Sequence, residues 1–122
     1  MVMNNSVVLT KKLTFIAKKP ISKDIFVGKL RELAKNIVGY LKDNESCKLG
    51  HVKFISTTNG EDYLQLSILD LDQNPKVSGF LKKTFDKIKV TLNVIVFGVN
   101  KADFDKRIDK EINGLKEYFH SS

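Results

Sequence analysis

The chain has 122 residues, of which 42% are hydrophobic and 29% charged, a balance typical of a folded protein and not of a disordered one. Its one cysteine, Cys47, excludes an internal disulfide framework, and no run of about 18 apolar residues could span a membrane. The first residues also lack a secretory signal, so we expect a single cytoplasmic domain over residues 1–122.

The first elements are predicted from periodicity. Residues 7–18 alternate apolar and polar side chains, which indicates a strand with one buried face that ends at Pro20. Ser22 is placed to cap a helix over about 23–43, whose apolar residues recur at helical spacing.

A hairpin is predicted next, from strands over residues 49–58 and 62–71. Asn59-Gly60 between them favours a tight turn, because both residues tolerate a positive φ. The alternation assigns the following side chains to the buried face: Val52, Phe54, Leu64, Leu66 and Ile68.

After a break at Asn74-Pro75, apolar residues at helical offsets predict a short helix over 77–88. Residues 89–99 predict a strand that is apolar on both faces. Asn100 is placed to cap a last helix over about 101–119.

The resulting order, β-α-β-β-α-β-α, predicts an α+β fold of the ferredoxin-like β-α-β-β-α-β type with an extra C-terminal helix. One sheet face would then carry apolar side chains that need a cover. The last helix, a second copy or a protein partner could supply it. The residues predicted for this interaction face are Ile16, Ile55, Tyr63, Leu69, Ile95 and Phe97.

The net charge of +7 allows contacts with anions or nucleic acid, although lysine-rich composition alone could explain it. Only two of the 21 basic residues are arginine, the residue that proteins favour for hydrogen bonds to the edges of nucleic-acid bases. RNA-recognition domains share the predicted element order and stack bases on aromatics of their two central strands. Here the first strand offers Phe15 on the core face, and the third offers Tyr63 alone on the open face. Any nucleic-acid binding is therefore predicted to be non-specific, with possible contacts at Lys12, Lys18 and Lys53.

Few residues suggest chemistry. His51 has no neighbour at metal-ligand spacing, and Cys47 lies beside Lys48, which would favour its thiolate. Asp70 and Asp72 could form a metal-binding pair, but their place before Asn74-Pro75 also suits turn chemistry. Nucleotide-binding glycine motifs are absent, so no catalytic residue, metal ligand or cofactor is predicted.

Residues 49–119 resemble the C-terminal region of metallochaperone GTPases related to the cobalamin-biosynthesis W protein. The similar features are Gly50-His51-Val52-Lys53, the turn glycine Gly60, and the strand from Leu92 to Val99. The P-loop and the thiolate metal motif of that family are missing, so the resemblance implies an accessory domain that contacts a partner or substrate protein.

Two functions are predicted. The first is a non-enzymatic interaction domain that self-associates through the apolar sheet face or binds a protein partner. The alternative is a lysine-rich nucleic-acid-binding protein. An enzyme centred on His51, Cys47 and Asp70 is the third and weakest hypothesis.

Overall fold

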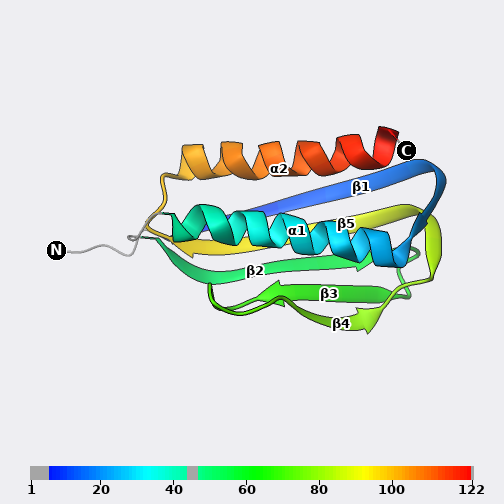
Figure 1. Cartoon of the computed structure of the whole chain (residues 1–122), viewed down its shortest axis with the longest axis horizontal. Coiled ribbons are helices and arrows are strands. Elements are labelled where there is room, and N and C mark those ends of the chain that lie inside the picture. The colour runs from blue at the N-terminus through cyan, green and yellow to red at the C-terminus, as the bar shows by residue number, and fades with distance from the viewer. Residues whose placement is uncertain (1–5, 44–46, 122) are drawn as a thin grey trace.

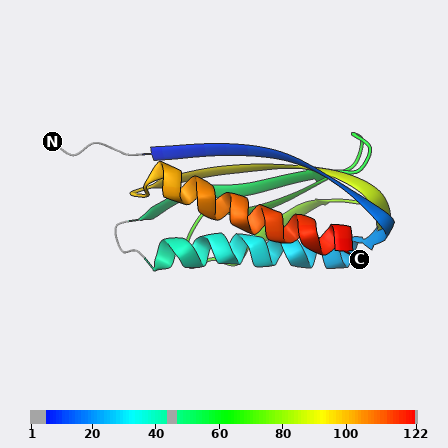
Figure 2. The same cartoon turned by 90° about the horizontal axis from the view of Figure 1, so that it is seen from above.

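The computed structural model describes residues 6–43 and 47–121, the last two by their backbone alone. Within these residues, five strands form one antiparallel sheet and two long helices cross one of its faces (Figures 1 and 2). In chain order the elements are β1 (Ser6–Ser22), α1 (Lys23–Lys42), β2 (Lys48–Thr57), β3 (Tyr63–Ile68), β4 (Lys76–Phe80), β5 (Thr84–Phe97) and α2 (Lys101–Ser121).

The strand order is β1-β5-β2-β3-β4. Because β1 and β2 both run antiparallel to β5, they are parallel to each other, and α1 makes the crossover that such a pair requires. The prediction of an α+β fold is confirmed. The ferredoxin-like arrangement is wrong, because the described chain contains two helices and a fifth strand in place of the second crossover helix.

The predicted helix over 77–88 is wrong: these residues belong to β4, to the connection over 81–83 and to the first part of β5. Gly79 has a φ of 84°, which a helix does not allow, and lies opposite Leu64 of β3. The first residues of β5 also supply backbone partners for the long β1 as far as Ser22. Pairing with distant strands therefore overrides the local helical spacing.

β1 confirms the predicted alternation, since its threonines are exposed and the apolar residues predicted for its inner face are buried: Val7, Leu9, Leu13, Phe15 and Ala17. The prediction that Pro20 ends the strand is wrong, since pairing with β5 resumes at Ile21. Pro20 lies where the register shifts, between Ile16 and Ile21, on a strand at the edge of the sheet. A missing N–H is tolerated there, because an edge strand pairs on one side only.

The two long helices are confirmed, with starts close to those predicted. Ser22 is the N-cap residue of α1, although its side chain makes no capping hydrogen bond. At the start of α2, the Asp103 amide donates to the side-chain oxygen of Asn100 at 3.0 Å, as a helix cap should. No helix among the described residues is long and apolar enough to cross a membrane.

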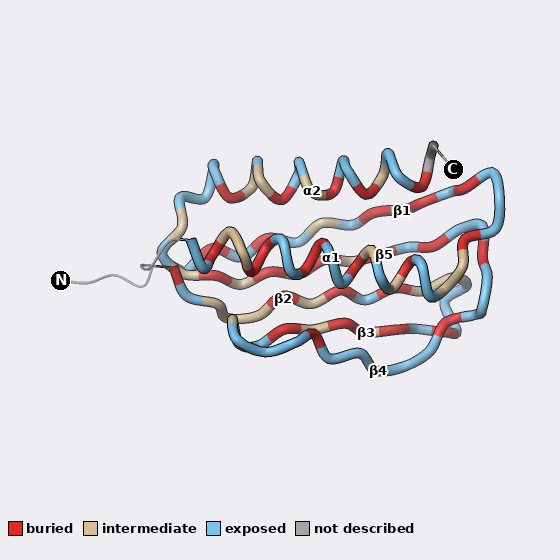
Figure 3. Tube along the Cα trace, in the orientation of Figure 1, coloured by how far each residue is buried: buried red, intermediate tan, exposed pale blue. Residues whose placement is uncertain are grey.

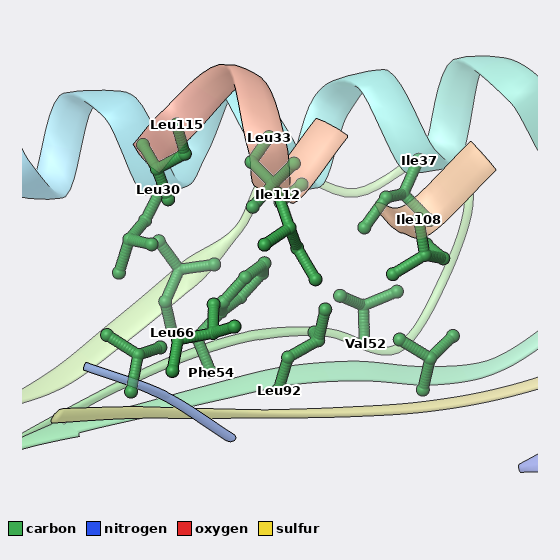
Figure 4. Packing of buried hydrophobic residues seen from close by; sticks show 14 of the residues in the cluster. Leu30, Leu33, Ile37, Val52, Phe54, Leu66, Leu92, Ile108, Ile112 and Leu115 are labelled. Atoms are coloured by element: carbon green, nitrogen blue, oxygen red, sulfur yellow. The ribbon is translucent and has the colours of Figure 1, made fainter. Parts of the chain in front are cut away.

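The core lies between the sheet and both helices. Leucines and isoleucines of α1 and α2 point toward apolar side chains from β2, β3 and β5 (Figure 4). At one end, the rings of Phe15, Phe26 and Phe119 pack together, with centroids 5.6 to 5.7 Å apart. Since both helices bury their apolar sides on this face, they leave the opposite face of the sheet uncovered.

The predicted hairpin of β2 and β3 is confirmed, but its turn is longer than Asn59-Gly60. Gly60 has a positive φ, whereas Asn59 does not, and the Asn59 side chain instead accepts hydrogen bonds from the amides of Glu61 and Asp62. The buried Asp62 carboxylate closes this loop and also accepts a hydrogen bond from the Lys82 amide in the β4–β5 connection.

Candidate open-face site

The candidate site is the sheet face turned away from the helices, here called the open face. Its members follow from the strand register, because residues directly opposite each other on antiparallel strands point to the same side. Buried and exposed positions alternate along β1, β2 and β5, and β4 is exposed throughout (Figure 3).

The residues predicted as an interaction face lie on or beside this surface. Ile16 is 63% exposed and Tyr63 51%, while Ile95 and Phe97 are half-buried beside their neighbours. Leu69 lies just past the end of β3 and is exposed. Ile95 and Phe97 are neighbours on this face of β5, and the exposed Val8 of β1 lies opposite Ile95. Threonine, asparagine and lysine separate this group from Ile16, Ile55 and Tyr63.

The expectation that the last helix folds over this surface is wrong. α2 packs beside α1 on the other face of the sheet, where Phe104, Ile108 and Phe119 are buried. Without a second crossover helix, α1 alone would leave β1 and β5 exposed on the core side, and α2 fills that place.

Lysines dominate the charge of the open face. They occur on four of the five strands, at positions that lie opposite a residue of a neighbouring strand, here called paired positions: Lys12, Lys48, Lys53, Lys76, Lys87 and Lys89. None of the paired open-face positions holds Asp or Glu, and none of these six lysines forms an ion pair within the described chain. Asp86 stands outside the paired positions, where the β1–β5 register shifts.

The rest of the chain is close to neutral, since these six lysines nearly equal its net charge of +7. Acidic residues gather on the helix side and in loops. Several of them form ion pairs with lysine or arginine, among them Glu32, Asp72, Asp105, Asp109 and Glu111. Lys11 illustrates the contrast with its neighbour Lys12: it points to the helix side and forms ion pairs with Asp105 and Asp109 of α2. Of the predicted anion contacts, Lys12 and Lys53 belong to the open face, whereas Lys18 is exposed in the irregular segment of β1.

An aromatic pair marks one corner of the open face. Tyr63 on β3 lies opposite Phe80 on β4, and Phe80 is 66% exposed. Neither ring contacts another aromatic ring in the described chain. Sequence reasoning missed Phe80 and Lys87 because it placed them in the helix over 77–88, and it missed Lys76 because this residue follows the predicted break at Asn74-Pro75. Alternation continued through Gly79 would have been the signal.

A polar row crosses three strands of the same face. The Asn93 side-chain nitrogen donates to the Thr10 hydroxyl at 2.9 Å, and the Asn93 oxygen lies 2.7 Å from Nε2 of His51. Since that oxygen can only accept, Nε2 of His51 carries a proton and Nδ1 faces away from this bond. The half-buried imidazole thus has a fixed orientation on the basic surface.

The hypothesis of a Cys47–His51 pair is not supported. Cys47 is buried among the core residues, 3.6 Å from the carbonyl oxygen of Gly98, whereas His51 belongs to the open face. Burial raises the pKa of the Cys47 thiol, so the expectation that Lys48 favours its thiolate is wrong.

Asp70 and Asp72 belong to a turn. The Asp70 carboxylate accepts a hydrogen bond from the Asp72 amide at 3.0 Å, and Asp72 lies 3.4 Å from Lys42 of α1. This is the turn chemistry that the sequence offered as one of two explanations. No cluster of three or more potential metal ligands occurs among the described residues.

Comparison with protein-family models, with curated proteins and with solved structures gave no match to this chain. The resemblance of residues 49–119 to metallochaperone GTPases therefore stays a prediction from the sequence.

Proposed function

We propose that the protein binds nucleic acid through the phosphate backbone, on the open face of its sheet. The observation that supports this most is the concentration of six lysines on one face. Within the described chain these lysines form no ion pair, and no position of this face that pairs with a neighbouring strand holds Asp or Glu. Phosphate groups neutralise such a surface and release their condensed counterions, which favours binding.

The chemistry of the face favours binding without sequence readout. The two arginines, Arg31 and Arg107, lie on the helices, so the open face carries only lysine. Lysine contacts phosphate as a point charge and lacks the planar fork that reads guanine edges. Thr10 and Asn93 already use hydrogen-bonding groups on each other.

Self-association through the apolar residues of this face remains the other prediction. Two copies that met by their open faces would bring both sets of lysines together and would have to desolvate them. Like charges at close range oppose such contact, so we place self-association behind nucleic acid as the function of this face.

The test compares two variants with the same loss of charge. Replacing Lys12, Lys53 and Lys89 by Gln removes three charges from the open face, and replacing Lys35, Lys106 and Lys110 removes three from the exposed helix side. Fluorescence anisotropy with labelled oligonucleotides measures affinity over a range of salt concentrations. We expect only the open-face variant to lose affinity, with a salt slope shallower by about 2 for a single strand.

Equal losses in the two variants would mean that net charge, not this face, attracts nucleic acid, and would contradict the proposal. Absence of binding at low salt would contradict it as well. Vesicles of phosphatidylglycerol present anionic phosphate groups on a membrane. Binding to these vesicles and not to oligonucleotides would show that the ligand of the open face is a lipid surface and not nucleic acid.

A further inference from the structure

We infer that the ligand of the open face is single-stranded nucleic acid, with bases stacked on Tyr63 and Phe80. This inference rests on the proposed function and adds the strand state of the ligand and the residues that select it. It starts from the aromatic pair, which the lysine argument does not use.

The two rings are exposed without an apparent structural role. Tyr63 and Phe80 are directly opposite on β3 and β4, and about half or more of each side chain is open to solvent. Neither belongs to the buried core, and neither contacts another aromatic ring in the described chain. Exposed aromatic rings on a sheet face offer the stacking surface that single-stranded nucleic acid uses.

The backbone holds this pair in place. Gly79 adopts a φ of 84° directly before Phe80, and a Cβ at this position would lie 2.3 Å from the Tyr63 carbonyl oxygen. The glycine lets β4 approach β3 closely, so that the next residue lies opposite Tyr63.

The lysines lie within reach of the same short strand of nucleic acid. Lys89 on β5 is separated from Tyr63 on β3 by two strand spacings, or about 10 Å. Lys76 is four residues from Phe80 along β4, or about 13 Å. A single strand of nucleic acid that crosses the open face can therefore stack bases on Tyr63 and Phe80 while its phosphates contact the lysines. A duplex keeps its bases stacked internally and cannot use the rings in this way.

The experiment compares three ligands: an oligothymidylate of about 12 nucleotides with no label on its bases, a duplex of the same length, and an abasic strand that keeps the phosphates. The variants are Tyr63→Leu and Phe80→Leu, with Tyr63→Phe as the conservative variant. Ile25→Ala serves as the control, because Ile25 is an exposed apolar side chain of α1, which packs on the other face of the sheet. Thermal melting verifies that each variant is folded.

We expect the wild type to prefer the oligothymidylate over the duplex and the abasic strand. Tyr63→Leu and Phe80→Leu should each weaken oligothymidylate binding at least about fivefold with an unchanged salt slope. Tyr63→Phe and Ile25→Ala should bind as the wild type does.

Equal affinity for all three ligands, or aromatic variants that bind like the wild type, would overturn the inference and leave the lysine-based function standing. Loss of binding by Ile25→Ala as well would also overturn it, because the loss would then not depend on a ring of the open face. If no oligonucleotide binds at low salt, the proposed function itself fails.

Discussion

Asp62 shows how one side chain joins two parts of this fold. Its carboxylate is buried and accepts hydrogen bonds from the Thr58 hydroxyl and from the amides of Thr58, Asn59 and Lys82. Burial by itself raises the pKa of Asp62, but the hydrogen bonds from Thr58, Asn59 and Lys82 outweigh it and lower the pKa to about 2. The charged form of Asp62 therefore stabilises the folded state.

We expect Asp62→Asn to lower the free energy of unfolding at pH 7 by about 2 kcal/mol. Because the folded pKa of about 2 lies below the ordinary value of 3.8, the unfolded chain takes up this proton first. The stabilisation is complete above the ordinary value and is lost as the pH falls toward 2. Urea unfolding at several pH values measures both effects.

Glu61→Gln is the matched control, since Glu61 is an exposed carboxylate in the same loop. It should change the unfolding free energy by less than about 0.5 kcal/mol. An Asp62→Asn protein that keeps both the stability and the acid sensitivity of the wild type would show that the carboxylate network contributes nothing.

Among the elements, β4 depends on a single backbone conformation. This edge strand has five exposed residues, and Gly79, the fourth of them, combines a positive φ with close contact to Tyr63. An L side chain at this position would be strained and would also clash with the carbonyl of the neighbouring strand.

We expect Gly79→Ala to destabilise the protein by about 1 to 3 kcal/mol and to detach β4 from β3. Amide hydrogen exchange should then quicken over residues 76–80 and leave the helices protected. Slow exchange at these amides in the variant would contradict the role given to Gly79.

The matched control is Gly28→Ala within α1. This glycine is helical and exposed, and an added Cβ would meet nothing within 4 Å. The same substitution should here stabilise the protein by about 1 kcal/mol, because alanine has the higher helix propensity. The opposite signs of the two changes separate backbone strain from a general effect of the added methyl group.

At the scale of the whole molecule, the arrangement of charge favours a single copy in solution. The open face collects lysines, and β1 at one edge of the sheet carries Lys11, Lys12, Lys18 and Lys19. The opposite edge strand, β4, is short and irregular at Gly79. Charged and short edges both oppose pairing between sheets.

We expect sedimentation velocity at low salt to give a monomer, for the wild type and for Ile95→Lys and Phe97→Lys alike. The reason is that self-repulsion of the lysine face is strongest when little salt screens it. A wild-type dimer that either variant dissociates would instead support self-association through the apolar residues of the open face.

Much of the local structure was predictable from the residues. Helical spacing in α1 and α2 and alternation in β1, β2 and β3 gave the correct type of element, because each reflects burial on one side only. The prediction for residues 77–88 was wrong because its apolar residues match a helical period by chance: Val77, Phe80, Leu81, Phe85 and Ile88. Gly79 has a backbone conformation that no helix allows. That single error removed Phe80 and Lys87 from the predicted open face.

The sequence by itself determined the composition of the two surfaces of each element, and with it the α+β class, both long helices and the alternation that separates core from solvent. Only the tertiary structure decided that β5 inserts between β1 and β2, and that α2 joins α1 on one face. These outcomes depend on backbone pairing between residues far apart in the chain, which no local pattern records. The gathering of lysines beside Tyr63 and Phe80 follows from the same pairing.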